Sequence, residues 1–451
     1  MDYQERLLRA IPGGAHTYSR GFDQFPSNAP QILERGEGAY VWDPEGRRFL
    51  DYGMGLRAVT LGYAYQSVAE AACKEIWKGN NLPRATTTEL EAAETIIDLI
   101  PGAEMVKFAK NGSNATTAAA KVARSYTGRP YICVPRQHPF FSFDDWFIGS
   151  TPLTRGIPPQ HAQTTLVFDY GDIESLKALF DAHPGQIAGV MLEPATTITP
   201  CAHSCTHTLS YENPCTSCIS NGSNFLHKVQ VLCRANGTLF ILDEMITGFR
   251  WHLQGAQTYF GVEPDLSTFG KGMANGFSVA ALVGRREIMD VGSISEPGAE
   301  RTFLLSTTHG GEMSSLRAFV ETVKVYKEKD VCRHHWHYGE KLRSGLLGLA
   351  KELGISDRFG IDGPAIAMNY VTRDASGAIS MEFRTLFAQE MARHGVLMSW
   401  ISVSLSHGET ELQMTLDAAR KALQVYAKAL NDGVGQYLEG PIMKPVFRKY
   451  N

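Results

Sequence analysis

The sequence predicts an α/β protein with a mostly parallel, mixed sheet flanked by helices, and a smaller α+β domain after it. Two observations lead to this fold class. Between about residues 105 and 242, apolar runs of strand length alternate with segments of helical period. Buried strands that alternate with helices are typical of a parallel sheet covered on both faces. After about residue 314 long helical segments dominate and the alternation stops.

The elements follow in chain order from the apolar periodicity and the turn residues. Two strands joined by a turn are expected within residues 38–50. Further strands are expected at 105–108, 131–134, 165–168, 187–192 and 238–242, and helices at 88–99, 115–126 and 225–236. The last part of the chain predicts helices at 314–329, 335–352, 383–394 and 418–430, and a strand near 365–371. We therefore expect an N-terminal segment (1–50), a large domain (51–313) with a cysteine-rich insertion (198–222), and a small C-terminal domain (314–451).

The composition excludes several function classes. Of 451 residues, 43% are apolar and 20% charged, which suffices for a large core without disulfides or metal. The formal net charge of -4 argues against binding to nucleic acid or to an anionic membrane. The charged N-terminus lacks the apolar stretch of a signal peptide, and no apolar run approaches the ~20 residues of a membrane span. A cytoplasmic location with reduced thiols is expected.

Acidic residues follow two of the expected strands, where ligand sites of open α/β sheets gather. Asp243 ends the run at 238–242, and a carboxylate in that place can balance a cation such as a protonated ring nitrogen. A salt-bridged or helix-capping aspartate would show the same pattern. Glu193 ends the run at 187–192 and suits the orientation of a cofactor hydroxyl or the gating of substrate. A plain strand-ending acid is the alternative for Glu193.

Lys271 stands between a short apolar run and a glycine-rich turn that includes Gly270, Gly272 and Gly276. Partial burial lowers the pKa of a lysine and yields the free amine that a Schiff base needs. Neighbouring glycines allow the backbone to approach a flat ring. A lysine in a solvated loop is the alternative interpretation.

A phosphate site is predicted where Asn111, Gly112, Ser113 and Asn114 follow a strand and open a helix. Backbone N–H groups at a helix N-terminus, together with a serine hydroxyl, bind phosphate well. An ordinary helix cap is the alternative. The order along the chain favours the functional interpretation of these residues. The phosphate site, Glu193, Asp243 and Lys271 come one after another in sequence, and each follows an expected strand.

At these residues the chain resembles a known family. The matching segments are Ile11–Gly14, Arg20–Phe22, Gly36–Asp43, Asp51–Tyr52, Asn111–Ala115, Asp243–Arg250, Pro264–Lys271 and Ser404–His407. They resemble the class III (ω-type) aminotransferases, which bind pyridoxal 5′-phosphate (PLP) and have PLP fold type I. Within that family the chain is similar to the glutamate-1-semialdehyde 2,1-aminomutase subgroup, from about residue 11 to residue 430.

The resemblance implies a role for each matched position. Lys271 would form the internal aldimine with PLP and move the proton between Cα and C4′, and Asp243 would pair with the pyridine nitrogen. Met245 stands where the family has a valine packed on the ring. Gly112, Ser113 and Asn114 would bind the phosphate. Thr308 corresponds to a residue that reaches the partner's phosphate, so an obligate homodimer with shared active sites is expected.

Two positions depart from the family pattern, and a third, Arg20, matches it. Where the family has Tyr-His-Gly, this chain has Gln137-His138-Pro139, so His138 or Phe140 would supply the flat face on the ring. Leu56, followed by Arg57, replaces a pocket tryptophan of the aminomutase. Arg20 matches an arginine that binds the substrate carboxylate there, which its bidentate fork suits. A surface salt bridge is the alternative for Arg20.

The largest departure is an insertion after Glu193-Pro194. The pattern Cys201-x3-Cys205-x9-Cys215-x2-Cys218 is typical of a four-thiolate structural zinc site, with His203 and His207 as spare ligands. An iron–sulfur cluster, free thiols or a disulfide pair are the alternatives.

The sequence thus predicts a biosynthetic PLP enzyme that moves an amino group. The donor would be an amino acid such as glutamate. The acceptor would be a ketone or aldehyde of a small molecule, and the aromatic stretch Phe140–Trp146 together with Arg20 favours a sugar-derived or carboxylate-bearing one. One alternative is an intramolecular aminomutase using the same residues. The other is a non-catalytic, zinc-anchored interaction protein on the same scaffold.

Overall fold

The computed structural model describes residues 2–201, 205–295 and 297–450. The chain forms two compact units. The terminal unit comprises Met1–Tyr65 with Arg333–Arg448, and the central unit comprises Gln66–Cys332 with Lys449–Asn451. These divisions lie at other positions than the boundaries after residues 50 and 313 that the pattern suggested. No helix in the described part of the chain is long and apolar enough to cross a membrane.

The central unit is an α/β layer structure. Its helices are α3 (Gln66–Ile76), α4 (Thr87–Leu99), α5 (Gly112–Thr127), α6 (Asp145–Ile148), α7 (Pro159–Ala162), α8 (Ile173–Ala182), α9 (Thr216–Ser220), α10 (Phe225–Ala235), α11 (Ala256–Phe260), α12 (Arg286–Met289) and α13 (Met313–Lys329). Its strands are β4 (Met105–Ala109), β5 (Tyr131–Pro135), β6 (Thr165–Phe168), β7 (Ile187–Leu192), β8 (Leu239–Asp243), β9 (Leu266–Phe269) and β10 (Ala280–Gly284). The strands and helices expected between residues 88 and 242 are all present, with ends displaced by a few residues.

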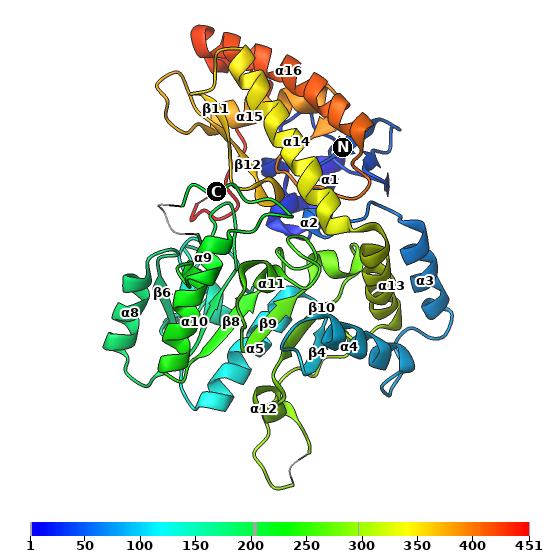
Figure 1. Ribbon diagram of the computed structural model, residues 1–451. Coiled ribbons are helices and arrows are strands. Elements are labelled where there is room, and N and C mark those ends of the chain that lie inside the picture. Colours follow the sequence, from blue (N-terminus) through cyan, green and yellow to red (C-terminus); the bar gives the residue numbers. More distant parts are fainter. Residues whose placement is uncertain (1, 202–204, 296, 451) are drawn as a thin grey trace. The chain divides into compact units, whose positions relative to one another are not determined.

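The seven central strands form one mixed sheet in the order β4-β10-β9-β8-β7-β5-β6 (Figure 1). Strand β10 runs antiparallel to its neighbours β4 and β9, and the other pairs are parallel. The expected mixed, mostly parallel sheet is therefore confirmed. The carboxyl ends of β4, β9, β8, β7, β5 and β6 consequently lie along one edge of the sheet, which we call the carboxyl edge.

Burial explains why these segments are continuous apolar runs. Every residue of β7, β8, β9 and β10 is buried, as expected for strands with protein on both faces. Helix α5 packs against β7, β9 and β10 through alanines such as Ala118, Ala119 and Ala123. Their small side chains allow the helix to lie close to the sheet. Helices α8 and α10 lie side by side (Figure 1), with α8 packed on β6 and α10 on β7 and β8.

The terminal unit is an α+β assembly. Its helices are α1 (Tyr3–Ala10), α2 (Met54–Arg57), α14 (Val331–Glu352, with its first two residues in the central unit), α15 (Met381–Arg393) and α16 (Glu409–Asp432). Its strands are β1 (Arg35–Glu37), β2 (Tyr40–Trp42), β3 (Arg48–Asp51), β11 (Phe359–Asp362), β12 (Asn369–Thr372) and β13 (Val396–Leu397). Strands β1, β2, β3 and β13 form one sheet, and β11 pairs with β12 in another.

Two expectations for this unit need correction. The strand expected near 365–371 begins only at Asn369, because Ala365–Ala367 forms a 3-10 turn directly after Pro364. Helix α16 begins at Glu409 rather than near residue 418. The Glu411 carboxylate accepts a hydrogen bond from the Gly408 N–H at 2.9 Å, which satisfies a backbone donor at the helix start.

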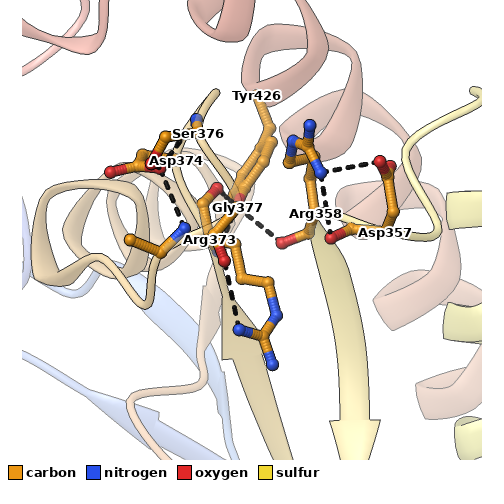
Figure 2. Close-up of polar contacts among 8 residues, drawn as sticks. Asp357, Arg358, Arg373, Asp374, Ser376, Gly377 and Tyr426 are labelled. Carbon is orange, nitrogen blue, oxygen red and sulfur yellow. Dashed lines mark hydrogen bonds and ion pairs between the residues drawn. The ribbon is translucent and has the colours of Figure 1, made fainter.

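Tyr426 of α16 anchors the β11–β12 pair (Figure 2). Its phenolic oxygen lies 3.0 Å from the carbonyl oxygen of Arg358 and 2.6 Å from that of Arg373, and it accepts the Arg373 N–H at 2.9 Å. Arg358 precedes β11 and Arg373 follows β12, so one buried hydroxyl holds both strand ends.

We expect Tyr426→Phe to lower the free energy of unfolding by ~1–3 kcal/mol, because the Arg373 carbonyl loses its buried donor. The Arg373 N–H and the Arg358 carbonyl keep their hydrogen bond to each other at 2.8 Å. Urea unfolding of the variant and the parent protein measures this difference. Tyr437→Phe is the control, since that phenol donates to Asp432 in an exposed contact. Equal effects of the two substitutions would contradict the anchoring role.

Candidate active site

The structure brings the residues expected at strand ends together along the carboxyl edge of the central sheet. Asp243 is the last residue of β8, and Glu193 directly follows β7. Lys271 follows β9 after one glycine, and Asn111 lies two residues after β4. His138 lies three residues after β5. Five segments that are distant in sequence therefore meet at one edge.

Asp243 is buried and only partly paired. Its Oδ1 accepts hydrogen bonds from the Met245 N–H and the Thr268 hydroxyl, both at 3.0 Å. Among the described residues no group donates a hydrogen bond to Oδ2. Burial raises the pKa of Asp243 to about 6, and the positive charge of Lys271 opposes this rise. A cation at Oδ2 would favour the ionised carboxylate in the same way.

The adjacent Glu244 differs in that its carboxylate is fully engaged. It accepts hydrogen bonds from the Thr247 hydroxyl, from the Ala256 N–H at 2.9 Å and from the Gln257 N–H at 2.7 Å. Burial raises the pKa of Glu244 to about 7. Because its oxygens already serve the start of α11, Glu244 holds the turn after β8 together and leaves Asp243 as the acid with an open oxygen.

Lys271 has an unusual backbone. Its φ is 42°, in the left-handed region, and the residue opens the 3-10 turn Lys271–Ala274. A non-glycine residue there costs about 1 kcal/mol or more, so the surrounding fold must impose this conformation. The side chain is partly buried, and its charge acts on Asp243 across the carboxyl edge.

The N-terminus of α5 is prepared for an anion. Asn111 caps the helix by accepting the Asn114 N–H at 3.1 Å through its side chain. The Ser113 hydroxyl oxygen accepts the Phe143 N–H at 3.1 Å, so the hydroxyl proton remains available as a donor. The first N–H groups of the helix and its dipole add to the attraction for a negative group.

Met245 packs between two glycines of neighbouring segments. A Cβ on Gly112 would lie 3.0 Å from the Met245 sulfur, and a Cβ on Gly270 would lie 2.5 Å from it. Met245 also packs with Ala109, Ala115 and other small residues. A larger residue at Gly112 or Gly270 would therefore displace the Met245 side chain from its position.

His138 is buried and has one open ring nitrogen. Its Nδ1 accepts the Glu193 N–H at 3.0 Å, and its ring lies against Tyr170 with centroids 4.9 Å apart. Nε2 has no hydrogen-bond partner among the described residues. Burial lowers the pKa of His138 to about 3, so the ring is neutral and Nε2 carries the proton. Phe140, the other expected stacking residue, is 43% exposed and packs edge-on against Phe147.

This depressed pKa predicts a pH dependence of stability. A histidine with a folded pKa near 3 and an ordinary value of 6.5 stabilises the fold above pH 6.5, and this contribution is lost as the pH falls toward 3. We expect the free energy of unfolding of the PLP-free protein to fall by about 1 kcal/mol more per pH unit than that of His138→Gln, between about pH 6 and pH 4. Urea titrations at several pH values measure this difference. Parallel curves would contradict the prediction, and exposed His161→Gln is the control.

The other expected site residues lie elsewhere. Thr308 is exposed in the loop before α13, and its carbonyl accepts a hydrogen bond from the Asn81 side chain at 3.0 Å. Arg20, Leu56 and Arg57 belong to the terminal unit. Arg20 is exposed, and Leu56 and Arg57 are partly buried with positive φ angles of 61° and 69°.

The four cysteines of the insertion form one cluster. The sulfur atoms of Cys201, Cys205, Cys215 and Cys218 all lie within 4.8 Å of one another. All four are free thiols, so the expected alternative of a disulfide is not found here. His207 lies near the cluster in sequence, but its Nε2 contacts the carbonyl oxygen of Asn213 at 3.0 Å. His203 lies outside the described residues.

Comparison with known proteins decides the family. The model of the class-III aminotransferases matches residues 23–198 and 218–419. The chain belongs to the class-III aminotransferases. It is thus a PLP-dependent enzyme of fold type I, as the resemblance implied. This membership speaks against the alternative of a non-catalytic, zinc-anchored interaction protein.

Relatives of this class-III aminotransferase include both transferases and mutases. It is 30% identical to the 3-aminobutyryl-CoA aminotransferase of Cloacimonas acidaminovorans, over 95% of this chain and 98% of the relative. It is 29% identical to the glutamate-1-semialdehyde 2,1-aminomutase of Alkaliphilus oremlandii, over 94% of this chain and 98% of the relative. Among solved structures, the FumI protein of Sphingopyxis sp. MTA144 with PLP superimposes with a TM-score of 0.81 at 26% identity, covering 96% of this chain and 97% of that chain.

The residues at the carboxyl edge fit PLP. Asp243 Oδ2 offers an open carboxylate oxygen for the pyridinium, and the start of α5 offers N–H groups for the phosphate. The buried N–H at His138 Nε2 has no acceptor among the described residues, and a polar atom of the cofactor would supply one. Gly112 and Gly270 keep the backbone beside Met245 free of side chains.

Three residues that contact or adjoin the expected residues of this class-III site were not predicted from the sequence. Thr268 is paired with Asp243 across β8 and β9, and only the strand register reveals this. Tyr170 lies behind His138, although its position two residues after β6 was a usable signal. Glu244 is adjacent to Asp243, and the sequence offers nothing to show which of the two acids has the open oxygen.

Proposed function

We propose that this enzyme transfers the amino group of a small amino-acid donor, such as glutamate, to the ketone or aldehyde carbon of a small acceptor. One observation carries the proposal. The partly buried Lys271 and the buried Asp243 with its open oxygen lie on the carboxyl edge together with the capped N-terminus of α5.

The chain's own residues divide the work as follows. PLP, when bound, supplies the electron sink for breaking bonds at the substrate Cα. Lys271 takes the proton from Cα and returns it, since a desolvated amine close to Asp243 is a base matched to this task. Asp243 keeps a positive charge on the ring nitrogen. The start of α5, with Gly112, Ser113 and Asn114, holds the phosphate.

The remaining residues of the edge orient and enclose the substrate. His138 and Met245 are proposed to border the ring, and Glu193, held against His138 by its backbone, is proposed to orient a polar group of cofactor or substrate. We propose that Thr308 completes the site of a partner subunit in a homodimer. Arg20, Leu56 and Arg57 are proposed to contact the acceptor, with Arg20 favouring a carboxylate.

An intramolecular aminomutase is the second candidate, and it is supported by the 29% identical relative of that name. The substitution of a pocket tryptophan by Leu56 weighs against it, because the small semialdehyde would lose that contact.

The test is a half-reaction. Purified protein with PLP is mixed with L-glutamate, L-alanine or other amino acids, and the visible absorbance of the bound cofactor is followed. Loss of the visible band with release of the corresponding 2-oxo acid supports transfer from an external donor. A band that ignores every amino acid but changes with an amino-aldehyde would favour the mutase, and failure to bind PLP would contradict both.

We also propose a structural zinc ion held by Cys201, Cys205, Cys215 and Cys218. Four thiolates fill the tetrahedral coordination that zinc prefers and leave no position for water. This metal would therefore take no part in the chemistry itself. A measurement of metal content by mass spectrometry tests it, with one zinc ion per chain expected.

A further inference from the structure

Three of the four clustered cysteines lie in a segment that the family model does not match. The class-III model leaves residues 199–217 unmatched, and these contain Cys201, Cys205 and Cys215. The segment connects β7, which ends beside Glu193, to α10, which begins at Phe225. An addition of this chain thus emerges directly from the carboxyl edge of the sheet.

The thiols are arranged for one metal ion. At a Zn–S distance of ~2.3 Å, the sulfurs of a tetrahedral site lie ~3.8 Å apart. The four sulfurs already lie within 4.8 Å of one another, and those of Cys205 and Cys215 are 3.4 Å apart. Cys215 and Cys218 are buried at the two-residue spacing of a zinc knuckle. The Cys218 carbonyl accepts the N–H groups of Ser223 and Asn224, which fixes this turn before α10.

Both ends of the segment between Glu193 and Cys201 are tied down. Near the active site, the Tyr170 hydroxyl donates to the Pro194 carbonyl at 2.7 Å. Near the cluster, the Phe225 N–H donates to the Pro200 carbonyl at 2.7 Å. The segment is therefore held between the cofactor edge and the residue that precedes the first cysteine ligand.

Tyr170 connects the two sites. Its ring contacts Phe225 and His138, each with centroids 4.9 Å apart. Its hydroxyl donates to the Pro194 carbonyl, so Tyr170 also holds the residue that follows Glu193. His138 in turn accepts the Glu193 N–H. A continuous set of contacts thus runs from Pro200, which precedes the first cysteine, through Phe225 and Tyr170 to His138.

Within the described residues 205–218, the insertion has two further anchors that involve tyrosines. Tyr259 donates to the Ser210 carbonyl at 2.7 Å, and Tyr211 donates to Asp330 at 3.1 Å. The insertion is therefore anchored to other segments of the central unit at Ser210 and Tyr211, between the second and third cysteines.

We propose that zinc at the four cysteines positions the active site, by fixing the Glu193–Cys201 segment and, through Tyr170, the orientation of His138 and Glu193 toward PLP. The inference rests on the cofactor and metal sites proposed above. In this arrangement Tyr170 is a positioning residue. The zinc ion binds outside the reacting groups, yet the affinity for PLP depends on it.

The experiment measures the coupling between the two ligands. Full-length protein is prepared with zinc, and a second sample is stripped with a chelator under reducing conditions. PLP dissociation constants are then determined by equilibrium dialysis. We expect removal of zinc to weaken PLP binding by about tenfold, a coupling in the usual range for linked sites. Reciprocity requires that bound PLP strengthen the affinity for zinc by the same factor at equilibrium.

Variants separate the coupling from simple unfolding. Cys215→Ser should lose zinc and weaken PLP binding to the level of the stripped protein, whereas exposed Cys73→Ser should retain both ligands. Tyr170→Phe should keep one zinc per chain but bind PLP several-fold more weakly. Removal of zinc from Tyr170→Phe should then change the PLP dissociation constant little further, because the hydrogen bond from the Tyr170 hydroxyl to the Pro194 carbonyl is already absent.

The outcomes distinguish the proposals. Zinc bound at one per chain with equal PLP affinity before and after its removal would overturn the coupling. Protein that binds no zinc after reconstitution, or that carries an iron–sulfur chromophore, would overturn the zinc site and with it this inference, but not the aminotransferase. Protein that binds zinc but never PLP would contradict the proposed function.

Discussion

Lys271→Ala is expected to lower kcat by ~10³-fold or more, because the group proposed to carry the proton at the substrate Cα is removed. The fold should persist, because alanine and lysine both carry a Cβ and meet a similar cost at this positive φ. The substitution removes only the partly buried side chain beyond Cβ. Single-turnover measurements with PLP and L-glutamate check the rate, and circular dichroism checks the fold. The phosphate site at α5 is untouched, so PLP should still bind.

Two comparisons sharpen this test. Lys271→Arg keeps the positive charge near Asp243 but offers no neutral amine, and it should be as inactive as the alanine variant. Lys107→Ala, an exposed lysine on β4, should retain full activity. If Lys271→Arg retained a substantial rate, charge rather than proton transfer would be the contribution of Lys271.

Asp243→Asn is expected to lower kcat by ~10²–10³-fold, the usual effect of removing one preorganised electrostatic partner. Asparagine has nearly the same shape, so the contacts with Met245 and Thr268 can persist through its carbonyl oxygen. What is lost is the negative charge that keeps the ring nitrogen protonated. The expected signature is a large fall in kcat with a smaller change in KM.

The neighbouring acid provides the matched control. Glu244→Gln changes an equally buried carboxylate that is saturated by three donors. It should reduce the free energy of unfolding while leaving kcat within about twofold, since no group of the reaction contacts it. Equal losses of kcat in both variants would contradict the assignment of the open oxygen to Asp243.

The sequence was sufficient for strands β4 to β8, because these are short apolar runs that alternate with helices. The antiparallel strand β10 was not expected. The sequence also placed Asp243, Glu193, Lys271 and Asn111 at strand ends, and parallel strands bring such ends together. Helix α16 was harder to delimit, because its first turns, from Glu409, carry mostly polar residues. Pro364 likewise shortened the expected strand near 365–371, which the apolar run alone did not show.

The contacts that tune the site were not predictable in the same way. The pairing of Thr268 with Asp243 depends on strand register, and the packing of Met245 between Gly112 and Gly270 depends on three separate segments. Burial of His138 with one open nitrogen is also a tertiary property, since the sequence shows only a histidine after a strand. Chemistry that follows a single strand is readable from the sequence, whereas chemistry shared between strands requires the structure.

The seven-stranded sheet also determines where the chain tolerates inserted residues. Side chains alternate between faces, so one residue added within β8 or β9 would turn Asp243 away from Thr268. Added residues in a connection cost little, because loop-closure entropy rises only slowly with length. The unmatched stretch 199–217 lies in such a connection, between β7 and α10. For protein engineering, this makes the β7–α10 connection the place to graft a sensor or a binding module, with the catalytic acids left in register.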